Sequence, residues 1–223
     1  MISSRDTLKF GVTLLVSYCL LTLIMVAFGE YLLRILLPLY SFFINIISTE
    51  LQVQSIALDN SGTTKQILTV VINPELLHLG KSSLPAGVPI QLSTLQGHSL
   101  QHLIIIYSIL LAWPPILSNN KQLATNKLKL LLISLPFVLI VEFFDVPFVL
   151  LGSAYDLIYS NLAPELVTSS LMIKFMDFLN GGGRLAFSLT AAIFTLATYN
   201  LIQTKSYNRL LLLMFSNAKP IKL

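Results

Sequence analysis

The sequence predicts a membrane protein that is mainly α-helical, with a four-helix transmembrane bundle and a small β-rich domain between spans one and two. Only 11% of its 223 residues are charged and 55% are hydrophobic, whereas about 25% of an average soluble domain is charged. The apolar residues form separate blocks of about 20, the length that a helix needs to cross a bilayer. Between the first two blocks, residues 49–97 show the partly alternating pattern of strands instead.

The first span is expected over residues 10–29. Arg5 and Lys9 precede it, as in a signal peptide, but no small-residue cleavage site follows, so we expect the span to be retained. Cys19, the only cysteine, lies inside this apolar run. That position favours a small packing residue over a nucleophile, and a single cysteine excludes an intrachain disulfide.

Residues 30–48 are also strongly apolar and complete the first region, residues 1–48. Glu30 and Arg34 are four residues apart and can pair on one helix face, while Pro38 should kink or interrupt a helix. This segment can extend span one beyond the membrane, lie along the outer surface or cross back. Extension or a surface position is favoured, because a crossing would leave only two residues as the turn.

Residues 49–97 are expected to form the small β-rich domain. The first strand pattern has a register fault near Ser55, and Asp59 begins an Asp-Asn-Ser-Gly turn. A loop that contains Gly80 precedes the last strand, where Pro89 suits an edge strand or a strand start. A domain of this size buries little core, so we expect it to lean on the membrane helices or on a partner. Three antiparallel strands are predicted, over residues 51–58, 63–72 and 88–95.

The rest of the chain, residues 98–223, is expected to be a three-span bundle with a basic cytoplasmic tail. A non-cytoplasmic amphipathic helix is predicted over residues 161–179. Pro164 lies near its first turn and Gly181 near its end, the usual asymmetry of helix ends. The three spans are expected at about residues 99–117, 130–151 and 185–203.

Basic residues predict the orientation of the spans. The N-terminus, the loop over residues 118–129 and the tail are short and rich in lysine and arginine, whereas the opposite side carries few over a longer stretch. We therefore expect a multi-pass protein of the bacterial inner (plasma) membrane, with both termini cytoplasmic and the β-rich domain outside. The basic residues of the three short regions are Arg5, Lys9, Lys121, Lys127, Lys129, Lys205, Arg209, Lys219 and Lys222.

Glu142 and Asp145, inside the third span, are the most informative residues of the sequence. An Asp at the centre of a span costs about 2.5–3.5 kcal/mol on insertion scales. The two acids are three residues apart, so both can face the interior of the bundle, and either carboxyl group could carry a proton in that low-dielectric setting. Pro147 frees a backbone carbonyl group nearby, which adds another polar group that needs a partner.

His98 and His102 are four residues apart and share a helix face at the outer end of span two. Such a pair can bind a metal ion when a third ligand comes from elsewhere in the chain. The simpler interpretation is that both histidines hydrogen-bond to the β-rich domain or to lipid headgroups. Two histidines alone are a weak metal signal, so the simpler interpretation is favoured, and no cofactor other than this candidate metal ion is predicted.

Arg184 follows three glycines and opens the fourth span at the outer interface. Its guanidinium group can reach inward to Asp145 or Glu142, or outward to lipid phosphate or a bound anion. Tyr155 is expected as an interface anchor just outside span three. These residues and the two histidines form either an ionic lock between spans two, three and four or a polar pocket for a ligand or metal. The lock is favoured, because a buried acid without a partner would be costly. The candidate cluster is His98, His102, Glu142, Asp145, Tyr155 and Arg184.

The layout is similar to that of the small accessory membrane proteins associated with bacterial exosortase systems, which have a first span, a compact non-cytoplasmic region and three further spans. The resemblance implies an accessory role without peptidase activity, since Cys19 lies in the cytoplasmic half of span one, far from the histidines. The segments that carry it are Gly97-His98 to Trp113-Pro114, Asp145-Val146-Pro147 and Phe178 to Arg184.

The sequence leaves three functions open. The preferred one is a non-catalytic accessory or structural subunit of a bacterial inner-membrane complex, with other integral membrane proteins and the lipid bilayer as partners and no nucleic acid. The alternative is a membrane enzyme, or a metal- or ligand-binding protein, with a polar site at the outer face. A transporter or channel component ranks third, because four spans with one acid pair and no visible inverted repeat make a poor pathway for a monomer.

Overall fold

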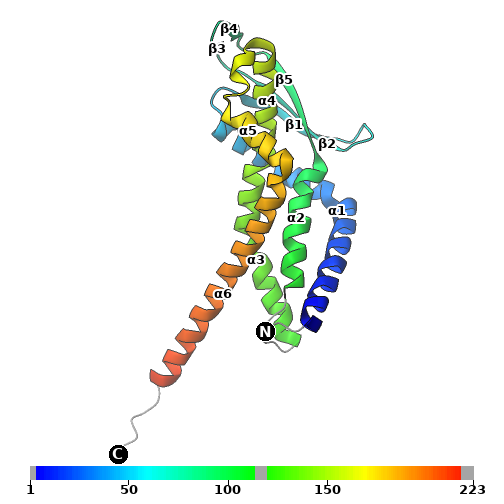
Figure 1. Ribbon diagram of the computed structural model, residues 1–223, viewed down its shortest axis with the longest axis vertical. Coiled ribbons are helices and arrows are strands. Elements are labelled where there is room, and N and C mark those ends of the chain that lie inside the picture. Colours follow the sequence, from blue (N-terminus) through cyan, green and yellow to red (C-terminus); the bar gives the residue numbers. More distant parts are fainter. Residues whose placement is uncertain (1–3, 114–119, 217–223) are drawn as a thin grey trace, which may run out of the picture.

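The computed structural model describes the backbone of residues 4–113 and 120–216 and the side chains of residues 7–113 and 126–204. Helices form a bundle at one end of the molecule, and a small sheet with α4 and α5 forms the other end (Figure 1). The helices are α1 (Ser4–Ile47), α2 (Gln96–Ala112), α3 (Asn120–Phe144), α4 (Val146–Leu162), α5 (Leu171–Phe178) and α6 (Arg184–Ser216). The strands are β1 (Gln52–Asp59), β2 (Gln66–Ile72), β3 (Leu77–Leu79), β4 (Ser82–Leu84) and β5 (Pro89–Leu95).

Within the described residues, three helical segments are long and apolar enough to cross a membrane: Thr7–Ile47, Asn126–Leu162 and Leu171–Thr204. They correspond to the expected spans one, three and four. The helix expected as span two, α2, has 17 residues and is about 26 Å long. It packs beside α1, α3 and α6 (Figure 1). By length and composition, the four-span prediction is therefore confirmed for three of its spans.

The first helix, α1, is continuous over 44 residues. It is about 66 Å long, roughly twice the thickness of the hydrocarbon core. Residues 30–48 therefore extend span one, and Pro38 lies inside the helix without ending it. Cys19 was expected to pack in the interior, but it lies on an exposed face of α1. In the later part of the helix, Tyr40 and Ile44 are fully buried one turn apart.

The sheet has the strand order β1-β2-β5, and all its pairs are antiparallel. Its register shifts between Val53 and Ser55, where the sequence predicted a fault. The Asp59 carboxylate accepts hydrogen bonds from the backbone N–H and the hydroxyl group of Ser61, which closes the predicted turn. A second, two-stranded sheet of β3 and β4 lies in the expected loop and turns at Gly80, whose φ is 61°.

The sheet has no separate core of its own, because its inner face packs on α4 and the later part of α1. Along β5 every second residue is buried, and Ile90 and Leu92 belong to one apolar cluster with Leu150, Ala154 and Ile44. The expectation that the β-rich domain leans on the helices is therefore confirmed. The cluster also includes residues of α5, so α4 lies between the sheet and α5.

The prediction of a helix over residues 161–179 was wrong in its bounds. The preceding helix α4 runs on to Leu162, well past the expected end of span three, and a short 3₁₀ turn, Pro164–Leu166, follows. The next helix, α5, begins only after Ser170, whose hydroxyl group accepts a hydrogen bond from the N–H of Ile173. The sequence pattern missed the continuation, because the buried residues of α4 pack on the sheet and on α5 and are as apolar as those of a span.

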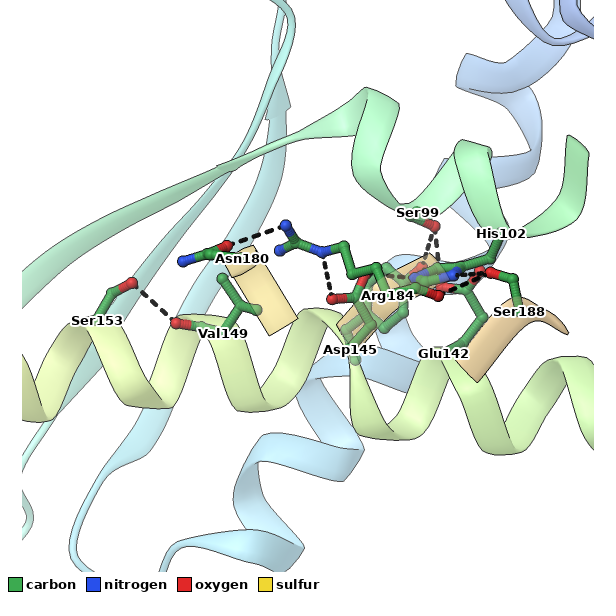
Figure 2. A network of polar contacts seen from close by, with 10 residues as sticks. Ser99, His102, Glu142, Asp145, Val149, Ser153, Asn180, Arg184 and Ser188 are labelled. Atoms are coloured by element: carbon green, nitrogen blue, oxygen red, sulfur yellow. Dashed lines mark hydrogen bonds and ion pairs between the residues drawn. The ribbon is translucent and has the colours of Figure 1, made fainter. Parts of the chain in front are cut away.

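A break at Asp145 separates α3 from α4. The backbone there has φ −96° and ψ −86°, outside the helical region. Pro147 accounts for it, because it has no N–H to donate to the carbonyl group of Phe143, four residues earlier, and its ring crowds that carbonyl group. The break turns the Asp145 side chain toward the bundle at the point where α3 ends (Figure 2).

Lys127 caps the C-terminal end of α2, the end away from the sheet. Its ammonium group donates hydrogen bonds to the carbonyl groups of Leu110, Leu111 and Trp113, at 3.1, 2.7 and 2.6 Å. A cation at the C-terminus of a helix satisfies carbonyl groups that have no partner within the helix. The sequence placed Lys127 in a polar loop, but the backbone is already helical from Asn120.

Candidate functional site

A buried polar network lies where α3 ends, enclosed by α1, α2 and α6 (Figure 2). It is called the Asp145 network here, after the residue at its centre. Each member is at most 8% exposed. Its members are Tyr40 from α1, Ser99 and His102 from α2, Glu142 and Asp145 from the end of α3, and Arg184 and Ser188 from α6.

Asp145 joins two helices through its two carboxylate oxygens. Oδ1 accepts a hydrogen bond from Nε of Arg184 at 2.7 Å, and Oδ2 lies 2.7 Å from Nε2 of His102. Because an ionised carboxylate only accepts hydrogen bonds, the histidine is the donor. The predicted pair between Asp145 and Arg184 is therefore present, and His102 adds a second partner from α2.

His102 continues the network to α6. Its Nδ1 atom lies 2.7 Å from the hydroxyl oxygen of Ser188, which also lies 3.0 Å from the carbonyl oxygen of Arg184. The hydroxyl group has one proton for these two acceptors. If it donates to Nδ1, the imidazole is neutral; if it donates to the carbonyl group, the imidazole carries both protons and is a cation.

Glu142 forms the second half of the network, one turn before Asp145. Its Oε2 atom accepts hydrogen bonds from the hydroxyl groups of Tyr40 at 2.6 Å and Ser99 at 2.9 Å. Those two hydroxyl groups also lie 2.7 Å apart. Oε1 is buried without a hydrogen-bond partner among the described residues. Glu142 thereby holds α1 and α2 against α3.

The three glycines before Arg184 have a structural role. Residues Leu179–Gly183 form a π-helical turn in which Gly182 has φ 116°, a conformation that side chains rarely adopt. A Cβ atom on Gly183 would lie 2.7 Å from the carbonyl oxygen of Phe178. Within this turn, Asn180 accepts a hydrogen bond from Nη1 of Arg184 at 2.9 Å, which orients the guanidinium group.

Two residues of the sequence-predicted cluster lie outside the network. Tyr155 is buried rather than at an interface. It donates a hydrogen bond to Glu50 at 2.9 Å and lies 3.2 Å from the hydroxyl oxygen of Ser48, so it ties α4 to the start of the sheet. His98 is half-buried beside the network, and its Nδ1 atom has no hydrogen-bond partner in the described part of the chain.

The geometry bears on the candidate metal site of His98 and His102. Both ring nitrogens of His102 are already within hydrogen-bond distance of Ser188 and Asp145. Among the described residues, no group of three or more His, Cys, Asp or Glu side chains is placed to hold a metal ion. A metal ion at His102 would therefore have to displace one of the hydrogen bonds that join the helices.

Sequence reasoning missed three members of the network: Tyr40, Ser99 and Ser188. Two of them carried a signal, because Ser99 lies three residues before His102 and Ser188 four residues after Arg184, on the same helix faces. Hydroxyl groups are common in apolar helices, however, and many bond back to their own backbone, as Ser108 does to Ile104. Tyr40 carried no signal, since its role depends on how α1 folds over the bundle.

Three of these residues are joined in series by hydrogen bonds, Ser188 to His102 and His102 to Asp145, as in the triad of a serine hydrolase. In the Ser-His-Asp triad the acid binds Nδ1 and the serine faces Nε2, whereas here the two nitrogens are exchanged. All three side chains are at most 1% exposed. The serine is therefore not exposed at the surface in this arrangement.

Comparisons of the chain with protein-family models, with curated proteins and with solved structures gave no match. The geometry defines a class of site nonetheless: a buried ionic and hydrogen-bonded lock between four helices.

Replacing Asp145 tests the lock. Asp145→Asn should lower the free energy of unfolding by about 3–5 kcal/mol, because it leaves a buried guanidinium group without its counter-charge. Arg184→Gln should lower the free energy of unfolding by a similar amount. The double variant should lower it by less than the sum of the two single effects. Denaturation in detergent micelles measures all three.

Glu30→Gln is the matched control, because it removes the exposed ion pair with Arg34, whose atoms are 2.8 Å apart. It should leave the stability almost unchanged. Equal effects of Asp145→Asn and Glu30→Gln would show that the network does not hold the bundle together.

The glycine turn gives a second stability prediction. Gly182→Ala should cost about 1–3 kcal/mol, because alanine is strained at a positive φ. Gly181→Ala is the control, since nothing lies within 4 Å of a Cβ atom there. Thermal unfolding in detergent should separate the two variants, and a loss at Gly181 as large as that at Gly182 would contradict the assigned role.

Proposed function

We propose that this protein is a non-catalytic accessory or structural subunit of a bacterial inner-membrane complex. In this proposal the bundle crosses the membrane four times, both termini are cytoplasmic and the sheet projects outside. The described ends of α1 and α6 both lie at the end of the bundle opposite the sheet (Figure 1). Lys9, Lys127 and Lys129 also belong to that end, which supports the orientation.

The observation that carries the proposal is how the Asp145 network uses its polar atoms. Both oxygens of Asp145 and both ring nitrogens of His102 lie within hydrogen-bond distance of other helices. Both side chains are also at most 1% exposed, so none of these four atoms is open to a substrate from solution. The network therefore favours a structural role over a reaction centre: it makes α1, α2, α3 and α6 a rigid bundle, called the stem here.

The stem holds the sheet and α4, which together are called the platform here. The sheet shares its core with α4, the continuation of α3 beyond the network. The ring of Tyr155 and the carboxylate of Glu50 fix α4 to the start of β1. Such a construction presents a sheet at a set height above the membrane, which suits a subunit that positions a partner. The resemblance to exosortase-associated accessory proteins makes an exosortase-type membrane peptidase the first partner to test.

Capture from native membranes tests the proposal. The full chain carrying an affinity tag, extracted in a mild detergent, should keep one integral membrane protein at constant stoichiometry through size exclusion. Reciprocal capture through that protein should recover the chain. Asp145→Asn should lower the recovery severalfold because the platform is no longer held, and Asp177→Asn, at an exposed acid of α5, should not. A stable monomer with no retained protein would overturn the proposal.

A membrane hydrolase is the second candidate, and the chain of hydrogen bonds through Ser188, His102 and Asp145 is the observation that favours it. A fluorophosphonate probe, which labels activated serines, distinguishes the two. The accessory subunit should remain unlabelled. Labelling that disappears in Ser188→Ala but persists in Ser99→Ala would favour the enzyme, because only the first serine contacts the histidine in this way.

A further inference from the structure

A groove of about 370 Å³ runs between α1 and α2 below the sheet. The two helices approach closely at Gly29, where a Cβ atom would lie 2.5 Å from the Leu100 side chain. The β1–β2 hairpin reaches over the same end of α1 and α2 (Figure 1), and it contributes Lys65 to the groove. The groove shares no lining residue with the Asp145 network.

The polarity of the groove changes along its length. Its deep part is lined by Tyr18, Met25 and Ile104, and its rim near the sheet by Glu30 and Lys65. Tyr18 and Glu30 are 12 positions apart on one helix, a rise of about 18 Å. One leaflet contributes about 15 Å of hydrocarbon. The groove therefore has the depth of one leaflet, with its charged residues at the level of the headgroups.

Among the residues that line the groove, the rim has one charge of each sign, and Arg34 lies beside it. Arg34 donates a hydrogen bond to Oε1 of Glu30 at 2.8 Å, which fixes the carboxylate. The carbonyl group of Lys65 accepts a hydrogen bond from the N–H of Gln96 at 3.1 Å, which fixes the backbone that carries the ammonium group.

We propose that this groove binds an aminophospholipid, with one acyl chain along α1 and α2 and the headgroup between Glu30 and Lys65. The phosphate of such a lipid pairs with the lysine, and its primary ammonium group donates hydrogen bonds to the carboxylate. A choline headgroup has no N–H to donate, and a glycerol headgroup has no cation. The charge pair therefore favours phosphatidylethanolamine over phosphatidylcholine and phosphatidylglycerol.

Native mass spectrometry of the full chain in a mild detergent tests this proposal. Phosphatidylethanolamine, phosphatidylcholine and phosphatidylglycerol with identical acyl chains are titrated in turn. The first should saturate one site at an about fivefold lower concentration than the other two, the ratio expected for a contact worth up to about 1 kcal/mol at an exposed rim. Equal saturation by all three lipids would overturn the proposal.

Variants locate the site. Lys65→Gln and Glu30→Gln should each remove the preference for phosphatidylethanolamine, while Lys81→Gln, the same charge change on the turn between β3 and β4, should keep it. Thr22→Trp fills the apolar part of the groove and should weaken the binding of all three lipids. A preference that survives both rim variants would place the lipid elsewhere and refute the assignment.

Discussion

The structure depends on the cost of placing carboxyl groups in an apolar bundle. Glu142 and Asp145 are each at most 1% exposed, and a bare carboxylate in such a setting costs several kcal/mol. Every other helix of the bundle supplies a group that offsets this cost: Tyr40 from α1, Ser99 and His102 from α2, and Arg184 from α6. The acids thereby select one packing of the helices, since apolar contacts alone are nearly as favourable with lipid as with another helix.

The same feature sets the position of the sheet. Because Pro147 breaks the helix at Asp145, the network fixes both the end of α3 and the start of α4. The sheet shares its core with α4 and has too few residues for an independent one. Gly152 allows α5 to pack closely on the other side of α4, since a Cβ atom there would lie 2.5 Å from that of Met176. The sheet is thus an extension of the helical bundle, with which it shares its core.

Much of this arrangement could be predicted from local signals. The pair of acids facing inward, the pairing of Asp145 with Arg184 and the three strands with a fault near Ser55 all follow from spacing and charge. The continuation of α4 could not be predicted, because an apolar helix that covers a sheet has the same composition as one that faces lipid. The role of Tyr40 depends on contacts 102 residues away, and the burial of Tyr155 depends on Ser48 and Glu50, which no periodicity links to it.

The order of the network along the chain has a consequence for biogenesis. A polypeptide enters the membrane from its N-terminus, so Asp145 reaches the lipid phase 39 residues ahead of Arg184. His102, by contrast, has already been inserted. The imidazole is therefore available to the nascent acid before the guanidinium group has been synthesised.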